Sequence, residues 1–186
     1  MRRRTAAVVA VLALGLLTGC SSSGKSGGSG GRISGLQTFD VKHGHKSGHL
    51  SYDQTPPAGG VHSPVWLRCD VYSAPVPNES AVHSLEHGAV WITYQETLPA
   101  ADIATLAKLD DLNRDYVLIS PYPGQSAPIM ATAWGLRITA DKADDPRLSA
   151  FVKAYAGGDQ GGEPGADCRN KGATPQQAEQ FINQGG

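Results

Sequence analysis

The segment HSLEH, residues 83–87, combines two imidazoles and one carboxylate at helical spacing. On an α-helix, positions i, i+3 and i+4 lie on one face, so His83, Glu86 and His87 are expected to project together. Two neutral imidazoles one turn apart can chelate a transition metal, and the carboxylate can complete or orient the site. The spacing therefore predicts a metal-binding helix, to which other segments must bring further ligands.

Further histidines precede this helix. His49 and His62 flank the segment TPPAGG at residues 55–60, which cannot form regular structure because prolines lack an amide donor and glycines favour turns. Such a loop can return ligands to the helix, whereas His43 and His45 lie in a polar segment and are predicted to be solvated. The predicted ligands are His62, His83, His87 and Glu86, with His49 or Met130 as additional candidates.

Three functions are compatible with this histidine pattern. In the first, the protein binds zinc or copper(II), the ions that imidazole and carboxylate ligands suit best. In the second, it is a zinc hydrolase with Glu86 as general base, since H-x-x-E-H is also the short signature of inverted zinc proteases. In the third, the histidines form a hydrogen-bonded network in a structural or partner-binding surface domain. We favour metal binding without catalysis, because Gly88 ends the expected helix directly after His87.

The N-terminus has the pattern of a bacterial export signal. Three arginines at residues 2–4 precede an apolar stretch too short to span a bilayer, and LTGC at residues 17–20 is similar to the bacterial lipobox. We therefore predict a signal peptide at residues 1–19, a lipid on Cys20, and a Gly/Ser-rich tether at residues 20–35. The expected location is the cell membrane, facing outside the cytoplasm, with the lipid anchor as the membrane contact.

The two remaining cysteines, Cys69 and Cys168, form an even pair for an oxidising compartment. A disulfide between them would close a loop of about 100 residues and restrict the unfolded chain. The alternatives are a pair of metal ligands or a redox-active pair, and the C-x-x-C spacing that would support either is lacking. We predict a structural disulfide.

The rest of the chain predicts one α+β domain over residues 36–186, with helices packed on a single mixed or antiparallel sheet. Apolar spacing favours helices at residues 80–87, 100–112 and 146–156, with a last helix capped by Thr174. Strands are expected at residues 89–94, 116–120 and 129–138, the last with a bulge at Trp134. The net charge of −1 and the lack of a Lys/Arg cluster argue against a nucleic-acid partner.

Four motifs occur in a characteristic order: YDQTPPAGGVH at residues 52–62, VHSLEHGAV at 82–90, PYPG at 121–124 and AWG at 133–135. Together they resemble a bacterial family catalogued only as a domain of unknown function, whose members are secreted, membrane-tethered or lipid-anchored. The resemblance covers about residues 45–170. It implies that signature positions of the family are occupied by His62, His83, Glu86 and His87, with Tyr94 and Trp134 nearby. It implies no activity.

Overall fold

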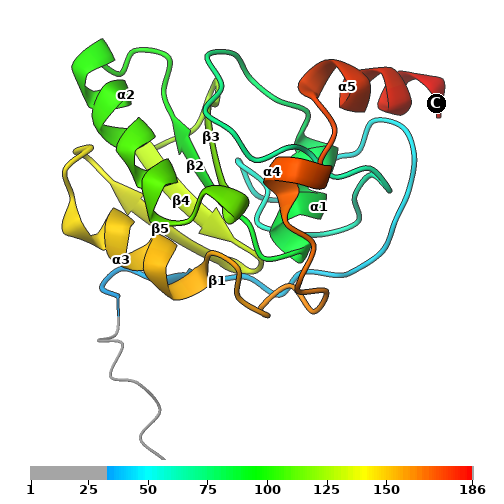
Figure 1. Ribbon diagram of the computed structural model, residues 1–186, viewed down its shortest axis with the longest axis horizontal. Helices are drawn as coiled ribbons and strands as arrows, with labels where there is room; N and C mark the ends of the chain where they lie inside the picture. Colours follow the sequence, from blue (N-terminus) through cyan, green and yellow to red (C-terminus); the bar gives the residue numbers. More distant parts are fainter. Residues whose placement is uncertain (1–32, 186) are drawn as a thin grey trace, which may run out of the picture. The chain divides into compact units, whose positions relative to one another are not determined.

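The computed structural model describes residues 33–185 (Figure 1). The predicted signal peptide, the lipidated Cys20 and most of the tether lie outside the described residues and stay predictions. Within the described range, no helix is both long and apolar enough to cross a membrane.

A five-stranded mixed sheet forms the centre of the domain. The strands are β1 (Gln37–Thr38), β2 (Val90–Tyr94), β3 (Val117–Pro121), β4 (Ile129–Ala133) and β5 (Leu136–Ala140), in the spatial order β1-β5-β4-β2-β3. The pair β2–β3 is parallel, with Val90 opposite Val117, and the other three pairs are antiparallel. The predicted α+β class with one sheet is confirmed.

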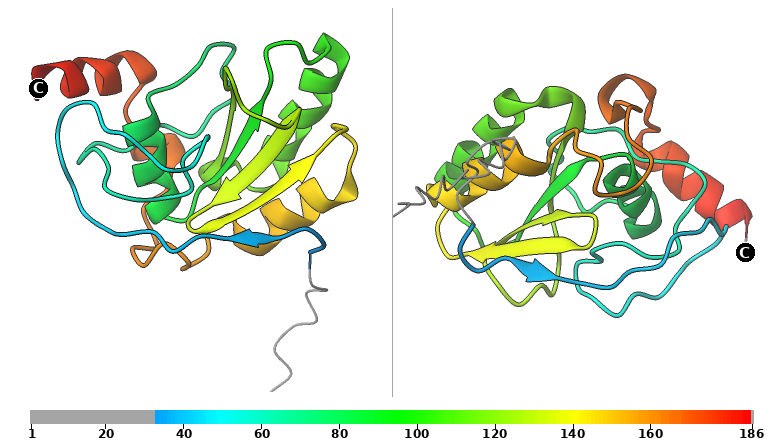
Figure 2. Two further views of the ribbon diagram at one scale, coloured as in Figure 1. Left: turned by 180° about the vertical axis from the view of Figure 1, so that it is seen from behind. Right: turned by 90° about the horizontal axis from the view of Figure 1, so that it is seen from below.

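Helices cover both faces of this sheet, as Figures 1 and 2 show. α2 (Ala100–Ala107) and α3 (Pro146–Tyr155) pack on one face, and α1 (Asn78–Glu86) lies on the other with α4 (Cys168–Lys171) and α5 (Pro175–Gln184). Successive side chains of a strand point to opposite faces. Ile92 therefore joins the core beneath α3, whereas Trp91 joins the core beneath α1. Because both faces are covered, all five residues of β2 are buried.

The predicted strand region at residues 129–138 is a hairpin rather than one bulged strand. β4 and β5 pair directly, with Ala133 opposite Leu136. Gly135 has φ 68°, a conformation that glycine adopts without strain, and this allows the chain to reverse within two residues. Trp134 consequently sits at the end of the hairpin instead of on a sheet face.

The helices agree with the predictions except near their ends. α1 begins at Asn78 after Pro77, two residues earlier than expected, and its first turn has no side-chain cap. α2 ends at Ala107 and continues as a 3₁₀ helix over Lys108–Leu112, which together span the predicted helix. Thr174 caps α5 with a reciprocal hydrogen bond to Gln177, so that predicted cap is confirmed.

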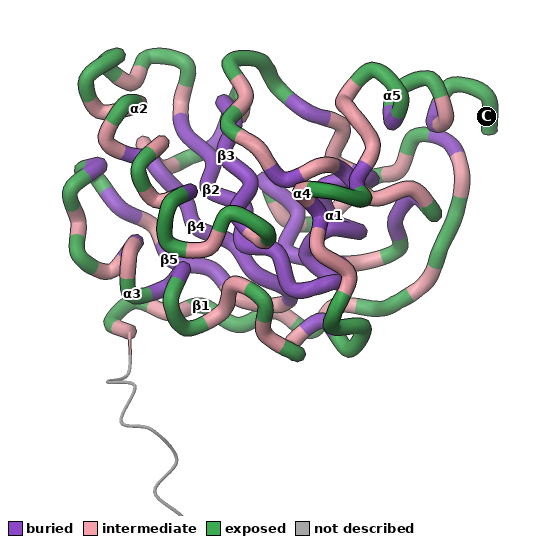
Figure 3. The backbone as a smooth tube through the Cα atoms, in the orientation of Figure 1, coloured by how far each residue is buried: buried purple, intermediate pink, exposed green. Residues whose placement is uncertain are grey.

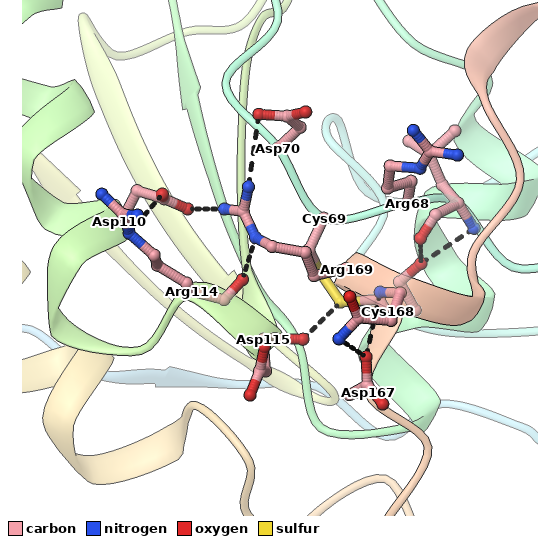
Figure 4. The surroundings of a disulfide bond; sticks show 12 residues. Arg68, Cys69, Asp70, Asp110, Arg114, Asp115, Asp167, Cys168 and Arg169 are labelled. Atoms are coloured by element: carbon pink, nitrogen blue, oxygen red, sulfur yellow. Dashed lines mark hydrogen bonds and ion pairs between the residues drawn. A yellow bond between two sulfur atoms is a disulfide. The ribbon is translucent and has the colours of Figure 1, made fainter.

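The predicted disulfide joins Cys69 to Cys168, with their Cα atoms 5.0 Å apart and 99 residues between them in sequence. Both cysteines are fully buried. Beside the bond, Arg169 donates to the carbonyl of Arg114 at 2.8 Å and to the carboxylate of Asp110 (Figure 4). The disulfide attaches α4 to the segment before α1, and this arginine attaches it to the 3₁₀ segments that follow α2.

Loss of the disulfide should destabilise the domain strongly, because the bond closes a loop of 99 residues. In the chain-entropy description, a loop of this length is worth about 4.7 kcal/mol. We expect replacement of Cys69 and Cys168 by serine to lower the free energy of unfolding by about 4 kcal/mol. Denaturant titration measures this, and a loss below about 1 kcal/mol would show that the bond is structurally unimportant.

Candidate metal centre

The HSLEH segment lies in the most enclosed helix of the structure. All of α1 from Glu79 to Glu86 is buried, because the sheet covers one side and long loops cover the others (Figure 3). Gly88, with φ 97°, ends the helix just after His87. The glycine-rich loop that follows α3 lies against this end, where a Cβ on Gly161 would meet the backbone of Glu86. The helix can thus present polar groups to an interior shielded from solvent.

Two extended segments bring more histidines to this helix. The amide of His62 donates to the carbonyl of Gly44 at 2.9 Å, and the amide of Lys46 donates to the carbonyl of His62 at 2.8 Å. This short parallel pairing places the rings of His45 and His62 with their centroids 4.7 Å apart. The amide of Ser63 donates to the carbonyl of Glu79 in α1, which fixes the paired segments against the helix.

Four side chains converge as a result: His45, His62, His83 and Glu86. Their ligand atoms all lie within 4.8 Å of one another. The Oε2 atom of Glu86 is 2.9 Å from Nε2 of His62 and 3.6 Å from Nε2 of His45. A tetrahedral zinc ion with bonds of about 2.0–2.1 Å holds its ligand atoms roughly 3.3 Å apart. The spacing therefore fits one metal ion after small shifts of the side chains.

Hydrogen bonds to backbone carbonyls fix the tautomers of three rings. The Nδ1 atoms of His62, His83 and His87 lie 2.7, 2.6 and 2.8 Å from carbonyl oxygens of Gly60, Ser63 and Glu163, respectively. A carbonyl oxygen only accepts, so each Nδ1 carries the hydrogen. In the neutral imidazoles the Nε2 atoms therefore have free lone pairs, which is the arrangement that metal-ligating histidines adopt.

These lone pairs face other acceptors at short range. Nε2 of His62 faces the carboxylate of Glu86, and both atoms are buried without a hydrogen-bond partner. Nε2 of His83 lies 2.9 Å from Nε2 of His87. Two acceptors at such distances repel each other unless a proton or a cation lies between them. The geometry is what a cation-binding site requires.

The electrostatics favour a metal ion over extra protons on the rings. Burial lowers the pKa of His83 to about 3 and also lowers the pKa of His62. Burial alone would raise the pKa of Glu86, but this pKa is lowered, and the hydrogen bond from His43 is the leading cause of the lowering. Neutral imidazoles next to an ionised carboxylate are the protonation states in which these groups bind metals.

Two tryptophans enclose the cluster. Trp66 packs against the rings of His83 and His87, with centroid distances of 5.3 and 5.0 Å. Trp134, placed by the β4–β5 turn, contacts the ring of His62 edge-on at 5.7 Å. Such apolar walls exclude water and strengthen electrostatic interactions inside the site.

The structure brings together three of the predicted ligands, His62, His83 and Glu86. His87 contacts the cluster through His83. His49 is not brought to it, since its Nε2 lies 3.0 Å from Asn183 and its Nδ1 3.9 Å from Glu79. Met130 is buried in β4, where it pairs with Thr93 and Thr139.

His43 and His45 are exposed to solvent, as predicted, but both also reach the cluster, which was not predicted. His45 belongs to the cluster, and Nδ1 of His43 lies 2.7 Å from Oε1 of Glu86. Both side chains remain partly exposed, in agreement with their polar surroundings in the sequence. The two rings reach the cluster because residues 44–46 pair with residues 61–63, a long-range contact that local sequence patterns do not show.

Residues 43–170 match the family described as protein of unknown function (DUF3105). The chain belongs to the DUF3105 family. This confirms the resemblance drawn from the four motifs, and the matched range of this DUF3105 protein contains every histidine and carboxylate of the cluster. No curated protein and no solved structure gives a significant match.

The buried histidines should make the metal-free domain sensitive to mild acid. Because the pKa of folded His83 is lowered to about 3, the unfolded chain binds up to one more proton than the folded chain between about pH 6.5 and about pH 3. Stability should therefore fall as the pH falls through this window, by up to about 1.4 kcal/mol per pH unit from His83. Urea unfolding in the presence of a chelator measures this slope.

The variant His83→Asn serves as the comparison, because its amide can still donate to the carbonyl of Ser63 but does not titrate. We expect a shallower pH dependence in the variant. Equal slopes in the variant and the unmodified chain would contradict a buried, neutral His83.

Proposed function

We propose that this DUF3105 protein binds one divalent transition-metal ion, zinc or copper(II), outside the cytoplasm while a lipid on Cys20 holds it at the membrane. The proposed ligands are His45, His62, His83 and Glu86, and His87 is the next donor behind His83. The observation that carries the proposal is that the Nε2 lone pair of His62 faces Oε2 of the buried Glu86 at 2.9 Å, with ligand atoms of His45 and His83 close by.

The donor set supports a borderline metal ion. Imidazole and carboxylate suit zinc and copper(II), whereas thiolate and thioether ligands select copper(I). Cys69 and Cys168 are joined in a disulfide, so neither offers a thiolate. A buried disulfide also agrees with the oxidising compartment in which copper(II) is the stable copper ion.

The position of Glu86 supports binding more than hydrolysis. Its side chain is 2% exposed, with Oε1 taking the hydrogen bond from His43 and Oε2 facing His62 and His45. A general base must reach a water molecule with a free oxygen. Oε1 is engaged by His43, and Oε2 is buried between two imidazoles where it has no access to solvent, so a ligand role explains the contacts better than the role of base in a zinc hydrolase.

Removal of two central ligands should abolish tight binding. For the unmodified full chain in detergent, calorimetry should show one zinc or copper(II) ion bound tighter than about 10 µM, which is about 7 kcal/mol. We expect the double variant His62→Ala/His83→Ala to show no such site. His49→Ala, which removes a histidine outside the cluster, should bind as the unmodified chain does.

Glu86→Gln separates binding from hydrolysis. We expect roughly tenfold or weaker metal affinity, because the amide has no charge and is a poorer ligand. Circular dichroism without metal checks that each variant is folded. If Glu86→Gln kept its metal and lost a measurable hydrolytic turnover, the hydrolase alternative would replace the binding protein.

The membrane location is tested by Cys20→Ser. This change removes the sulfur that a diacylglycerol would modify, and one lipid-bearing residue is the only anchor that the sequence predicts. We expect the protein to move from the membrane fraction to the soluble fraction, as detected by fractionation and immunoblotting. Retention of Cys20→Ser in the membrane through its N-terminus would contradict the lipid anchor.

A further inference from the structure

His43 makes contacts that a surface residue does not need. Its side chain is 54% exposed, yet Nδ1 donates to Oε1 of Glu86 at 2.7 Å. Its ring also lies against the indole of Trp134, with centroids 4.6 Å apart and planes inclined by 31°. On another side, a Cβ on Gly162 would be 3.5 Å from Cε1 of His43. Contacts from α1 and from the β4–β5 turn therefore hold this half-exposed ring, and Gly162 leaves room for it.

The hydrogen bond from His43 gives the two oxygens of the Glu86 carboxylate different surroundings. Oε1 is occupied by His43, while Oε2 is buried without a hydrogen-bond partner and faces His62 and His45. A carboxylate can rotate about its last side-chain bond. The bond from His43 fixes this rotation in the orientation that points Oε2 into the cluster.

His43 also lies where the cluster approaches solvent. Within the cluster, His62, His83 and Glu86 are almost completely buried, and His45 is 42% exposed. Trp66 and Trp134 close other sides of the rings. The side of the cluster that faces solvent is therefore the side that carries His45 and His43.

We propose that His43 is a positioning residue that holds Glu86 and covers the solvent side of the site, and so sets how long the metal ion stays bound. The proposal rests on the metal-binding function proposed above. In this proposal the metal ion can exchange, and its residence time in the site depends on His43, whose imidazole is not itself a ligand. Partners of ligating carboxylates typically contribute 10- to 100-fold in metal affinity.

The test is a release experiment on the full chain in detergent, loaded with copper(II) and mixed with excess EDTA. Copper(II) quenches nearby indoles, so the recovery of Trp66 and Trp134 fluorescence reports the dissociation rate. We expect His43→Ala to release the ion about 10- to 100-fold faster than the unmodified chain. Capture of copper(II) should change less than release, because the loss of the hydrogen bond that holds Glu86 weakens the bound state itself.

Two further variants define the role. His43→Asn places an amide donor near the position of Nδ1, so we expect it to restore most of the slow release. His49→Ala removes a histidine that is more exposed than His43 and lies outside the cluster, and it should release the ion at the unmodified rate.

Each contrary result has one meaning. Unchanged release from His43→Ala, with copper(II) bound by the unmodified chain, would overturn the role of His43 but leave the metal site intact. Loss of stoichiometric binding in His43→Ala would also overturn it, because His43 would then be a ligand. Failure of the unmodified chain to bind copper(II) or zinc would instead overturn the proposed function, and this inference with it.

Discussion

Lone pairs that face one another inside a protein repel each other unless a positive charge lies between them, and the cluster around α1 contains such pairs. Nε2 of His62 faces Oε2 of Glu86 at 2.9 Å, in a region that water does not reach. Backbone carbonyls hold the hydrogens of the rings on the opposite nitrogens, so the rings cannot relieve the repulsion by changing tautomer. The cost of such an unpaired arrangement is several kcal/mol, which a bound cation would turn into a favourable interaction.

The fold provides this arrangement by enclosing one short helix. α1 packs on the sheet through Val82 and Leu85, and the adjacent face of the helix carries His83 and Glu86. The paired segments 44–46 and 61–63 then bring His45 and His62 from outside the helix. The Cys69–Cys168 disulfide fastens the loop after His62 to the C-terminal part of the chain, so the surroundings of the helix are linked covalently.

Local patterns predicted much of this structure. The helical spacing of HSLEH gave the correct face for His83 and Glu86, and the even cysteine pair gave the correct disulfide. Trp134 was misplaced because a single glycine was interpreted as a bulge, although Gly135 reverses the chain and creates β5. A Trp-Gly pair between two apolar runs is compatible with a bulge inside one strand and with a tight turn between two strands, so the local sequence does not distinguish them.

The roles of His43 and His45 were beyond sequence patterns for a different reason. Both lie in an extended segment whose position depends on two hydrogen bonds with His62, one accepted by Gly44 and one donated by Lys46, across 16 to 18 positions of the chain. Pairings at this separation are determined by tertiary packing, and no local propensity encodes them. An alternating H-G-H pattern is compatible with either a solvated turn or a strand edge that directs both rings to one side.

The most direct test of the account is the X-ray absorption spectrum of the zinc-loaded full chain at the zinc edge. The account predicts a first shell of nitrogen and oxygen only, at about 2.0–2.2 Å, with the outer-shell scattering of several imidazole rings. A spectrum with oxygen neighbours alone, as for hydrated zinc, or with a sulfur ligand at about 2.3 Å would contradict the His/Glu site.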